Sequence, residues 1–256
     1  MPAIIKKNDH KAVRTMEQKP DDCFLITSAA VQTTLKPEHF DPAYLKQLTT
    51  TAHRNNGRAT VWFFNITESD RAVLRHYHRG GMVAKVVNDQ FIWTGINRTR
   101  AVSEYRLLEW MHTQGLPVPE PLGARVQRHG MFYTCDLITR LYPDSRTMAQ
   151  TLSSATLDDN IWHDTGYTIA KIHQHNIWHS DLNANNILIN DQGQIKLIDF
   201  DRCRRRTGER WKQKNLERLE RSLNKLTRLN QIQYFDKSKW QLLLDGYREG
   251  VAANQL

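Results

Sequence analysis

The sequence His179-Ser180-Asp181-Leu182-Asn183-Ala184-Asn185-Asn186 is followed by a second polar cluster, Ile198-Asp199-Phe200-Asp201. Asp181 precedes Asn186 by five residues and Asp199 by eighteen. Between the two clusters, apolar runs at residues 187–190 and 194–198 flank Asp191-Gln192-Gly193, and a turn of this kind predicts a β-hairpin. The polar clusters therefore lie at the two ends of one predicted hairpin.

This pattern resembles the catalytic loop and the metal-binding Asp of the protein-kinase-like superfamily, H-x-D-L-x-x-x-N followed by Asp-Phe. Phosphoryl transfer spreads negative charge over phosphate oxygens, and hard cations held by carboxylate and amide oxygens neutralise it. The resemblance makes Asn186 and Asp199 the expected Mg²⁺ ligands. Asp181 is expected to accept a hydrogen bond from the acceptor hydroxyl and to hold it in line with the γ-phosphate of ATP. His179 is expected to orient the loop through a backbone hydrogen bond, without transferring a proton.

The residues before this region predict strands around one helix. Residues 59–66 and 72–77 are rich in β-branched and aromatic residues and predict a hairpin, with an earlier strand expected before Gly57. The apolar residues Ala101, Tyr105, Leu108 and Met111 recur at helical spacing and predict a helix over residues 97–112. Strand-like runs follow at residues 122–127 and 131–141. Four strands and one helix come close to the N-lobe of a kinase.

Tyr142-Pro143-Asp144-Ser145 interrupts this pattern and predicts a hinge near residues 140–146. The residues beyond it are mostly helical in character. We therefore predict an α+β, protein-kinase-like two-lobe fold, with a small β-rich N-lobe at residues 41–143 and a mostly helical, shortened C-lobe at residues 144–256. Residues 1–40 are left as an N-terminal extension.

The nucleotide contacts in the N-lobe leave two alternatives. No G-x-G-x-x-G occurs, and Gly57 marks the best candidate for a loop over the phosphates. Lys85, in Val83-Ala84-Lys85-Val86, precedes Glu104 by nineteen residues, a familiar kinase spacing. Its rival Arg75 lies on the second strand of the predicted hairpin, where the phosphate-binding cation belongs if Gly57 marks the phosphate loop. We favour Arg75, and Glu104 is expected to pair with whichever cation serves.

The chain carries a formal net charge of +9, and its basic residues are unevenly placed. Residues 202–214 hold seven Lys or Arg residues and one Glu, which gives +6 in one short stretch. Arg204, Arg205 and Arg206 lie in this stretch and favour an anionic partner, although a solvated helix end is the other interpretation. The three cysteines of the chain form no Cys-x-x-Cys pair, so neither a disulfide framework nor a zinc site is expected. The stripe of Leu216, Leu219, Leu223, Leu226 and Leu229 after the basic stretch is expected to pack against the domain.

A narrower resemblance runs from about residue 50 to the C-terminus. Residues 73–81, 91–95, 98–101 and 115–119 look like the bacterial 3-deoxy-D-manno-octulosonic acid (Kdo) kinases, which belong to the lipopolysaccharide core kinases. The resemblance implies ATP and Mg²⁺ as cofactors and transfer of the γ-phosphate to the 4-hydroxyl of Kdo on a lipid A precursor. It also implies a peripheral location at the cytoplasmic face of the inner membrane, where the anionic surface is a partner and nucleic acid is not.

Departures from protein kinases agree with an acceptor other than protein. Ser180 replaces the loop arginine, Asn183 stands where many kinases keep a lysine, and Asp201 replaces the glycine of Asp-Phe-Gly. Two alternatives stay open. One is another small-molecule kinase of this fold, of the aminoglycoside or sugar type, and the other is a lipid-binding pseudokinase.

Overall fold

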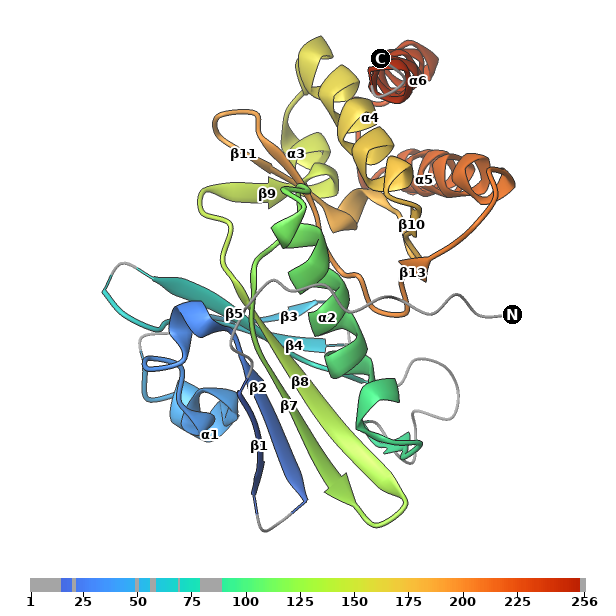
Figure 1. Ribbon diagram of the computed structural model, residues 1–256. Coiled ribbons are helices and arrows are strands. Elements are labelled where there is room, and N and C mark those ends of the chain that lie inside the picture. Colours follow the sequence, from blue (N-terminus) through green and yellow to red (C-terminus); the bar gives the residue numbers. More distant parts are fainter. Residues whose placement is uncertain are drawn as a thin grey trace. The chain divides into compact units, whose positions relative to one another are not determined.

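The computed structural model describes residues 15–19, 22–48, 51–55, 59–68, 70–78 and 89–253. Two compact units form, shown in Figure 1. The strand-rich unit comprises residues 1–96 and 122–138, and the helical unit comprises residues 97–121 and 139–256. The fold is α+β, as predicted from the sequence. The expected lobe boundaries at residues 41–143 and 144–256 stay a prediction.

The strand-rich unit is built on one eight-stranded sheet in the order β1-β2-β7-β8-β5-β4-β3, with β6 paired to β8. The strands are β1 (Thr15–Lys19), β2 (Cys23–Thr27), β3 (Thr51–Asn55), β4 (Ala59–Asn65), β5 (Arg71–His76), β6 (Phe91–Ile92), β7 (Pro121–His129) and β8 (Phe132–Arg140). Three short helices, η1 (Ala29–Val31), η2 (Pro37–Phe40) and α1 (Pro42–Leu45), follow β2.

The predicted hairpin and the strand before Gly57 are both confirmed. β4 and β5 pair antiparallel, with Trp62 opposite Leu74, and β3 pairs with the other edge of β4. Alternation of apolar residues along β4 and β5 places Trp62, Phe64 and Leu74 in a buried core. The strand order thus puts residue 57 between the first two strands of this segment and Arg75 on the third.

Part of the region left as an N-terminal extension belongs to the same sheet and core. β2 pairs antiparallel with β7, and Phe24 lies opposite Val126. The core includes residues of β2, β7 and β8 and of the segment with short helices after β2; they are Leu25, Val31, Leu35, Phe40, Leu45, Leu122 and Ile138.

The helical unit contains the remaining helices and two small sheets. Its helices are η4 (Ile96–Arg98, at its border), α2 (Arg100–Thr113), α3 (Met148–Ser154), α4 (Asp159–Gln174), η5 (Ala184–Asn186), α5 (Arg210–Arg228) and α6 (Lys237–Ala252). β9 (Ser145–Thr147), β11 (Ile187–Asn190) and β12 (Ile195–Leu197) form one sheet, and β10 (Ile177–Trp178) pairs with β13 (Arg204–Arg205) in the other. Within the described ranges, no helix is both long and apolar enough to cross a bilayer.

The helix predicted over residues 97–112 and the hairpin after the catalytic loop are confirmed. Ala101, Tyr105, Leu108 and Met111 are all buried on α2. β11 and β12 pair antiparallel around residues 191–193, so the two polar clusters lie at the ends of one hairpin. Of the predicted leucine stripe, Leu216, Leu219 and Leu223 are buried on α5, whereas Leu229 is 51% exposed at the end of the helix. α5 contacts η5, the last part of the catalytic loop.

α4 and α6 pack at very short range because glycines lie at their contact. A methyl group added at Gly246 would lie 1.9 Å from the carbonyl oxygen of His163, and one at Gly166 would lie 1.8 Å from the carbonyl oxygen of Leu243. Only a residue without a Cβ fits at such distances. α6 was not predicted from the sequence.

Candidate active site

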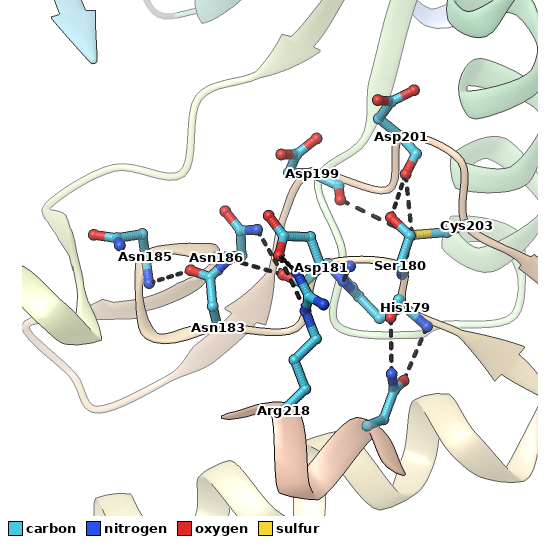
Figure 2. A network of polar contacts seen from close by, with 11 residues as sticks. His179, Ser180, Asp181, Asn183, Asn185, Asn186, Asp199, Asp201, Cys203 and Arg218 are labelled. Atoms are coloured by element: carbon cyan, nitrogen blue, oxygen red, sulfur yellow. Dashed lines mark hydrogen bonds and ion pairs between the residues drawn. The ribbon is translucent and has the colours of Figure 1, made fainter. Parts of the chain in front are cut away.

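The loop from His179 to Asn186 is shaped by its own polar side chains (Figure 2). Asn183 caps the short helix η5, and its Oδ1 accepts a hydrogen bond from the backbone N–H of Asn185 at 2.8 Å. The Nδ2 groups of Asn183 and Asn186 both donate to the carbonyl oxygen of Asp181 at 2.9 Å. The backbone at Asp181 is therefore held by two side chains from the same loop.

His179 is a structural residue, as predicted. It is 1% exposed, and its Nε2 lies 3.0 Å from the carbonyl oxygen of Ile198 while its Nδ1 lies 3.2 Å from the backbone N of Asp181. Nδ1 must accept from an N–H, so Nε2 carries the proton and donates to Ile198. Burial lowers the pKa of His179, which keeps the ring neutral. The histidine thus links the catalytic loop to the strand before Asp199.

A buried polar chain from α4, α5 and α6 supports this histidine. Asn215 on α5 accepts from the backbone N–H of His179 at 3.1 Å and donates to its carbonyl oxygen at 2.9 Å. The same Oδ1 of Asn215 lies 3.3 Å from Nε2 of His173, whose Nδ1 lies 2.9 Å from the hydroxyl of Tyr247. Burial lowers the pKa of His173 to about 3, so this ring is neutral too. All groups of the chain are paired, as buried polar networks require.

Asn186 and Asp199 form the pair of residues suited to a hard cation. The Nδ2 of Asn186 is occupied by Asp181, so its Oδ1 is turned away from that bond. The backbone carbonyl oxygen of Asn186 accepts a hydrogen bond from the backbone N–H of Ile198 at 3.0 Å, which brings Asp199 close to Asn186. Asp199 has a φ of +63°, a left-handed conformation that costs on the order of 1 kcal/mol and is concentrated at functional sites. In Figure 2 the oxygens of Asn186, Asp181 and Asp199 gather on one side of the loop.

α2 is tied to the segment after Asp199 by two contacts. Glu104 is 3% exposed and accepts a hydrogen bond from the backbone N–H of Phe200 at 3.1 Å, so it is a buried residue of α2. Arg100 pairs with the carboxylate of Asp201, with Nε 2.8 Å from Oδ1 and a second contact from Nη2 to Oδ2. Asp201, which the sequence showed only as a replacement for glycine, therefore joins this segment to α2.

Ser180 and Cys203 close the other side of the segment. The hydroxyl of Ser180 donates to the carbonyl oxygen of Asp201 at 2.6 Å, and its N–H donates to the sulfur of Cys203 at 3.2 Å. Burial raises the pKa of the Cys203 thiol to about 12, which keeps it protonated and unreactive. Ser180, at the position of the kinase loop arginine, therefore holds the catalytic loop against the segment after Asp199 by hydrogen bonds.

The carboxylate of Asp181 is half exposed and forms an ion pair with Arg218 on α5. Nε of Arg218 lies 3.1 Å from Oδ1, and its Nη2 contacts the same oxygen. No contact between Arg218 and the catalytic loop was predicted from the sequence. One feature of the sequence could have indicated this contact: Arg218 follows the buried Asn215 by three residues and so lies on the same face of α5, the face that meets the catalytic loop.

The three arginines predicted to meet an anionic partner lie on aromatic side chains. The guanidinium groups of Arg204 and Arg206 lie 5.4 and 5.5 Å from the ring centre of Trp178, and that of Arg205 lies 3.8 Å from Trp110. All three arginines are exposed. Cation–π contacts hold an arginine in place and leave its N–H groups open to a ligand.

Of the predicted nucleotide-site residues, Glu104 lies in the helical unit and Arg75 in the strand-rich unit. Arg75 lies on β5, where its Nη2 donates to the hydroxyl of Tyr77 at 3.0 Å. Gly57 and Lys85 lie outside the described residues. Their roles therefore stay predictions.

Known proteins of similar sequence cover most of this chain. A family model described as the lipopolysaccharide kinase (Kdo/WaaP) family matches residues 44–247. A 3-deoxy-D-manno-octulosonic acid kinase of Photobacterium profundum is 38% identical over 208 residues, which cover 81% of this chain and 87% of that protein. A protein of the same name from Vibrio cholerae is 41% identical over 66% of this chain and 72% of its own length, and one from Actinobacillus succinogenes is 33% identical over 91% and 99%.

Proposed function

Because this chain belongs to the lipopolysaccharide kinase (Kdo/WaaP) family, we propose that it transfers the γ-phosphoryl group of ATP to the 4-hydroxyl of Kdo on a lipid A precursor. The observation that carries the proposal is the grouping of Asp181, Asn186 and Asp199 around one hairpin, with their oxygens on the same side of the catalytic loop. The choice of Kdo as the acceptor is based on the relatives named above, since each is a 3-deoxy-D-manno-octulosonic acid kinase. Both observations are needed, because the site alone specifies only phosphoryl transfer.

Asp181 is the residue that meets the acceptor hydroxyl. Its Oδ1 is paired with Arg218, whereas Oδ2 accepts no hydrogen bond from any residue that the structure describes. A hydroxyl that donates to Oδ2 is held by a carboxylate whose backbone is fixed from two sides. Asp181 then keeps the hydroxyl oxygen in line with the phosphoryl group and accepts its proton as the new bond forms.

Asn186 and Asp199 fit Mg²⁺ by the chemistry of their donor atoms. Mg²⁺ prefers oxygen ligands and is commonly held by one or two carboxylates together with substrate phosphates. Bound there, Mg²⁺ neutralises charge on the phosphate oxygens. The protein contributes orientation: the amide of Asn186 is fixed by Asp181, and the N–H of Phe200, next to Asp199, is held by Glu104.

Arg75 is our candidate for the cation that binds the α- and β-phosphates, with Lys85 as the alternative. In protein kinases the loop over the phosphates joins the first two strands, and the cation lies on the third. β3, β4 and β5 follow this order, with Gly57 between the first two and Arg75 on the third. Glu104, buried on α2, is the proposed carboxylate partner of either cation.

Arg204, Arg205 and Arg206 support attachment of the enzyme to the cytoplasmic face of the inner membrane as a peripheral protein. Three exposed guanidinium groups held on two tryptophans make a compact cationic surface. Both the anionic membrane surface and the phosphates of a lipid A precursor carry the complementary charge.

The test is incubation of the purified protein with ATP, Mg²⁺ and a Kdo-bearing lipid A precursor, with ³¹P and ¹H NMR to locate the added phosphate. The proposal expects one phosphate on the 4-hydroxyl of Kdo. Phosphate on another hydroxyl of Kdo would show that the 4-position is wrong and that the reaction is still phosphoryl transfer to Kdo. If the protein phosphorylated a neutral sugar or an aminoglycoside but not this precursor, Kdo would not be the acceptor.

A further inference from the structure

Arg218 is placed at the catalytic carboxylate by a rigid part of the helical unit. Asn215, one turn earlier on α5, bonds with both backbone groups of His179, and Leu216 and Leu219 are buried beside it. These contacts fix α5 against the catalytic loop, so the guanidinium of Arg218 has a defined position beside Asp181.

The ion pair itself contributes little to stability. The side chains of Arg218 and Asp181 are 47% and 50% exposed, and ion pairs that water reaches this freely are worth little. An arginine bonded to a catalytic carboxylate also occupies one of its two oxygens and leaves the other for the acceptor hydroxyl. Its position therefore indicates a role in the reaction.

The N–H groups of Arg218 are only partly used. Nε and Nη2 both donate to Oδ1 of Asp181, and no residue that the structure describes accepts a hydrogen bond from Nη1. A guanidinium group binds carboxylates in a two-pronged arrangement, which gives both affinity and orientation. Arg218 thus offers an oxyanion site next to the oxygen that we assign to the acceptor hydroxyl.

We infer that Arg218 binds the carboxylate of the acceptor sugar and thereby selects an acidic sugar, an inference that rests on the proposed function. In a 3-deoxy-2-ulosonic acid, only C3 separates the carbon that carries the 4-hydroxyl from the carbon that carries the carboxyl group. A hydroxyl bonded to Asp181 therefore brings the carboxylate within a few ångströms of it. Arg218, which is bonded to the other oxygen of Asp181, lies within the same short range.

The experiment compares two acceptors, the Kdo-bearing lipid A precursor and the same compound with the Kdo carboxylate converted to a carboxamide. Initial rates give kcat/KM on each acceptor for the wild type, Arg218→Gln, Arg218→Lys and Arg221→Gln. Arg221 is the matched control, because it lies one turn further along α5, is 68% exposed and pairs only with Glu217 among the described residues.

The wild type should prefer the carboxylate acceptor by about ten- to a hundredfold, the range expected for a hydrogen bond between charged groups. Arg218→Gln should lose this preference, because its kcat/KM falls strongly on the carboxylate acceptor and much less on the carboxamide. The activity that remains on the carboxamide also shows that the variant is folded. Arg218→Lys should retain part of the preference, and Arg221→Gln should retain all of it.

Equal loss on both acceptors after Arg218→Gln would overturn the inference, since it would mean that Arg218 serves the loop or the phosphoryl group. Slower hydrolysis of ATP by Arg218→Gln in the absence of acceptor would overturn it for the same reason. If the wild type transferred phosphate to neither acceptor, the proposed function would fail, and the inference with it.

Discussion

Asn215 forms hydrogen bonds with both backbone groups of His179, accepting at 3.1 Å and donating at 2.9 Å. Replacement by leucine would leave a buried N–H and a buried C=O unpaired, which costs about 1–3 kcal/mol for each group. We expect Asn215→Leu to lower the melting temperature and to reduce kcat by about tenfold or more while the KM for ATP changes little, because loose positioning of a catalytic group is costly. Steady-state kinetics and thermal unfolding, with the exposed residue Gln213→Ala as control, check this; an unchanged kcat for Asn215→Leu would contradict it.

The strand order predicts which cation binds ATP. Arg75 lies on β5, the third strand around Gly57. We expect Arg75→Ala to weaken ATP binding by about ten- to a hundredfold, the worth of a hydrogen bond between charged groups, and Lys85→Ala to weaken it much less. Calorimetric titration with a non-hydrolysable ATP analogue and Mg²⁺ measures both. A loss confined to Lys85→Ala would reverse the assignment.

The arginine cluster predicts binding that depends on salt. Each basic residue near an anionic surface contributes about 1 kcal/mol, and exposed charges are screened as ionic strength rises. We expect replacement of Arg204, Arg205 and Arg206 by Gln to release the protein from vesicles with anionic lipid and to reduce activity on the lipid acceptor. Sedimentation with vesicles at low and at high salt measures the bound fraction of the wild type and of the triple variant. Unchanged vesicle binding and unchanged activity in the triple variant would show that the cluster is a solvated surface.

His173 predicts acid sensitivity. Burial lowers its pKa from 6.5 to about 3, so the folded protein leaves it neutral while the unfolded chain takes up a proton below pH 6.5. Stability is therefore lost as pH falls from about 6.5 towards 3, on the order of 1 kcal/mol per pH unit from this group. His173→Gln keeps hydrogen-bonding capacity without this titration and should show a shallower loss in urea unfolding between pH 6 and 4. The exposed residue His112, replaced by Gln, is the reference. If the free energy of unfolding fell equally steeply with pH in the wild type and in His173→Gln, His173 would not be the source of the acid sensitivity.

Local sequence signals predicted much of the helical unit. The β11–β12 hairpin follows from two apolar runs around Asp191-Gln192-Gly193, and α2 follows from apolar residues at helical spacing. Both depend on the period of neighbouring residues and on turn chemistry, which the sequence carries locally. The structural role of His179 was predicted for the same reason, because the loop motif has a fixed spacing.

Contacts between distant residues were not predictable. Arg218 and Asp181 are 37 residues apart, and Arg100 and Asp201 are 101 apart; no local pattern links either pair. β2 has a strand-like composition, but its partner β7 lies about a hundred residues further along the chain, so residues 1–40 were left as an extension. α6 depends on Gly246 lying against His163 in α4, which only the folded chain brings together.

The most direct test of the account measures the rate of phosphoryl transfer from ATP to the Kdo-bearing lipid A precursor by the wild type and by Asp181→Ala. We expect product from the wild type in the presence of Mg²⁺ and a fall in kcat of about 10²–10⁴-fold in the variant, the usual contribution of a positioned base. Equal rates in the two proteins would contradict the role of Asp181. Absence of product from the wild type would contradict the proposed reaction itself.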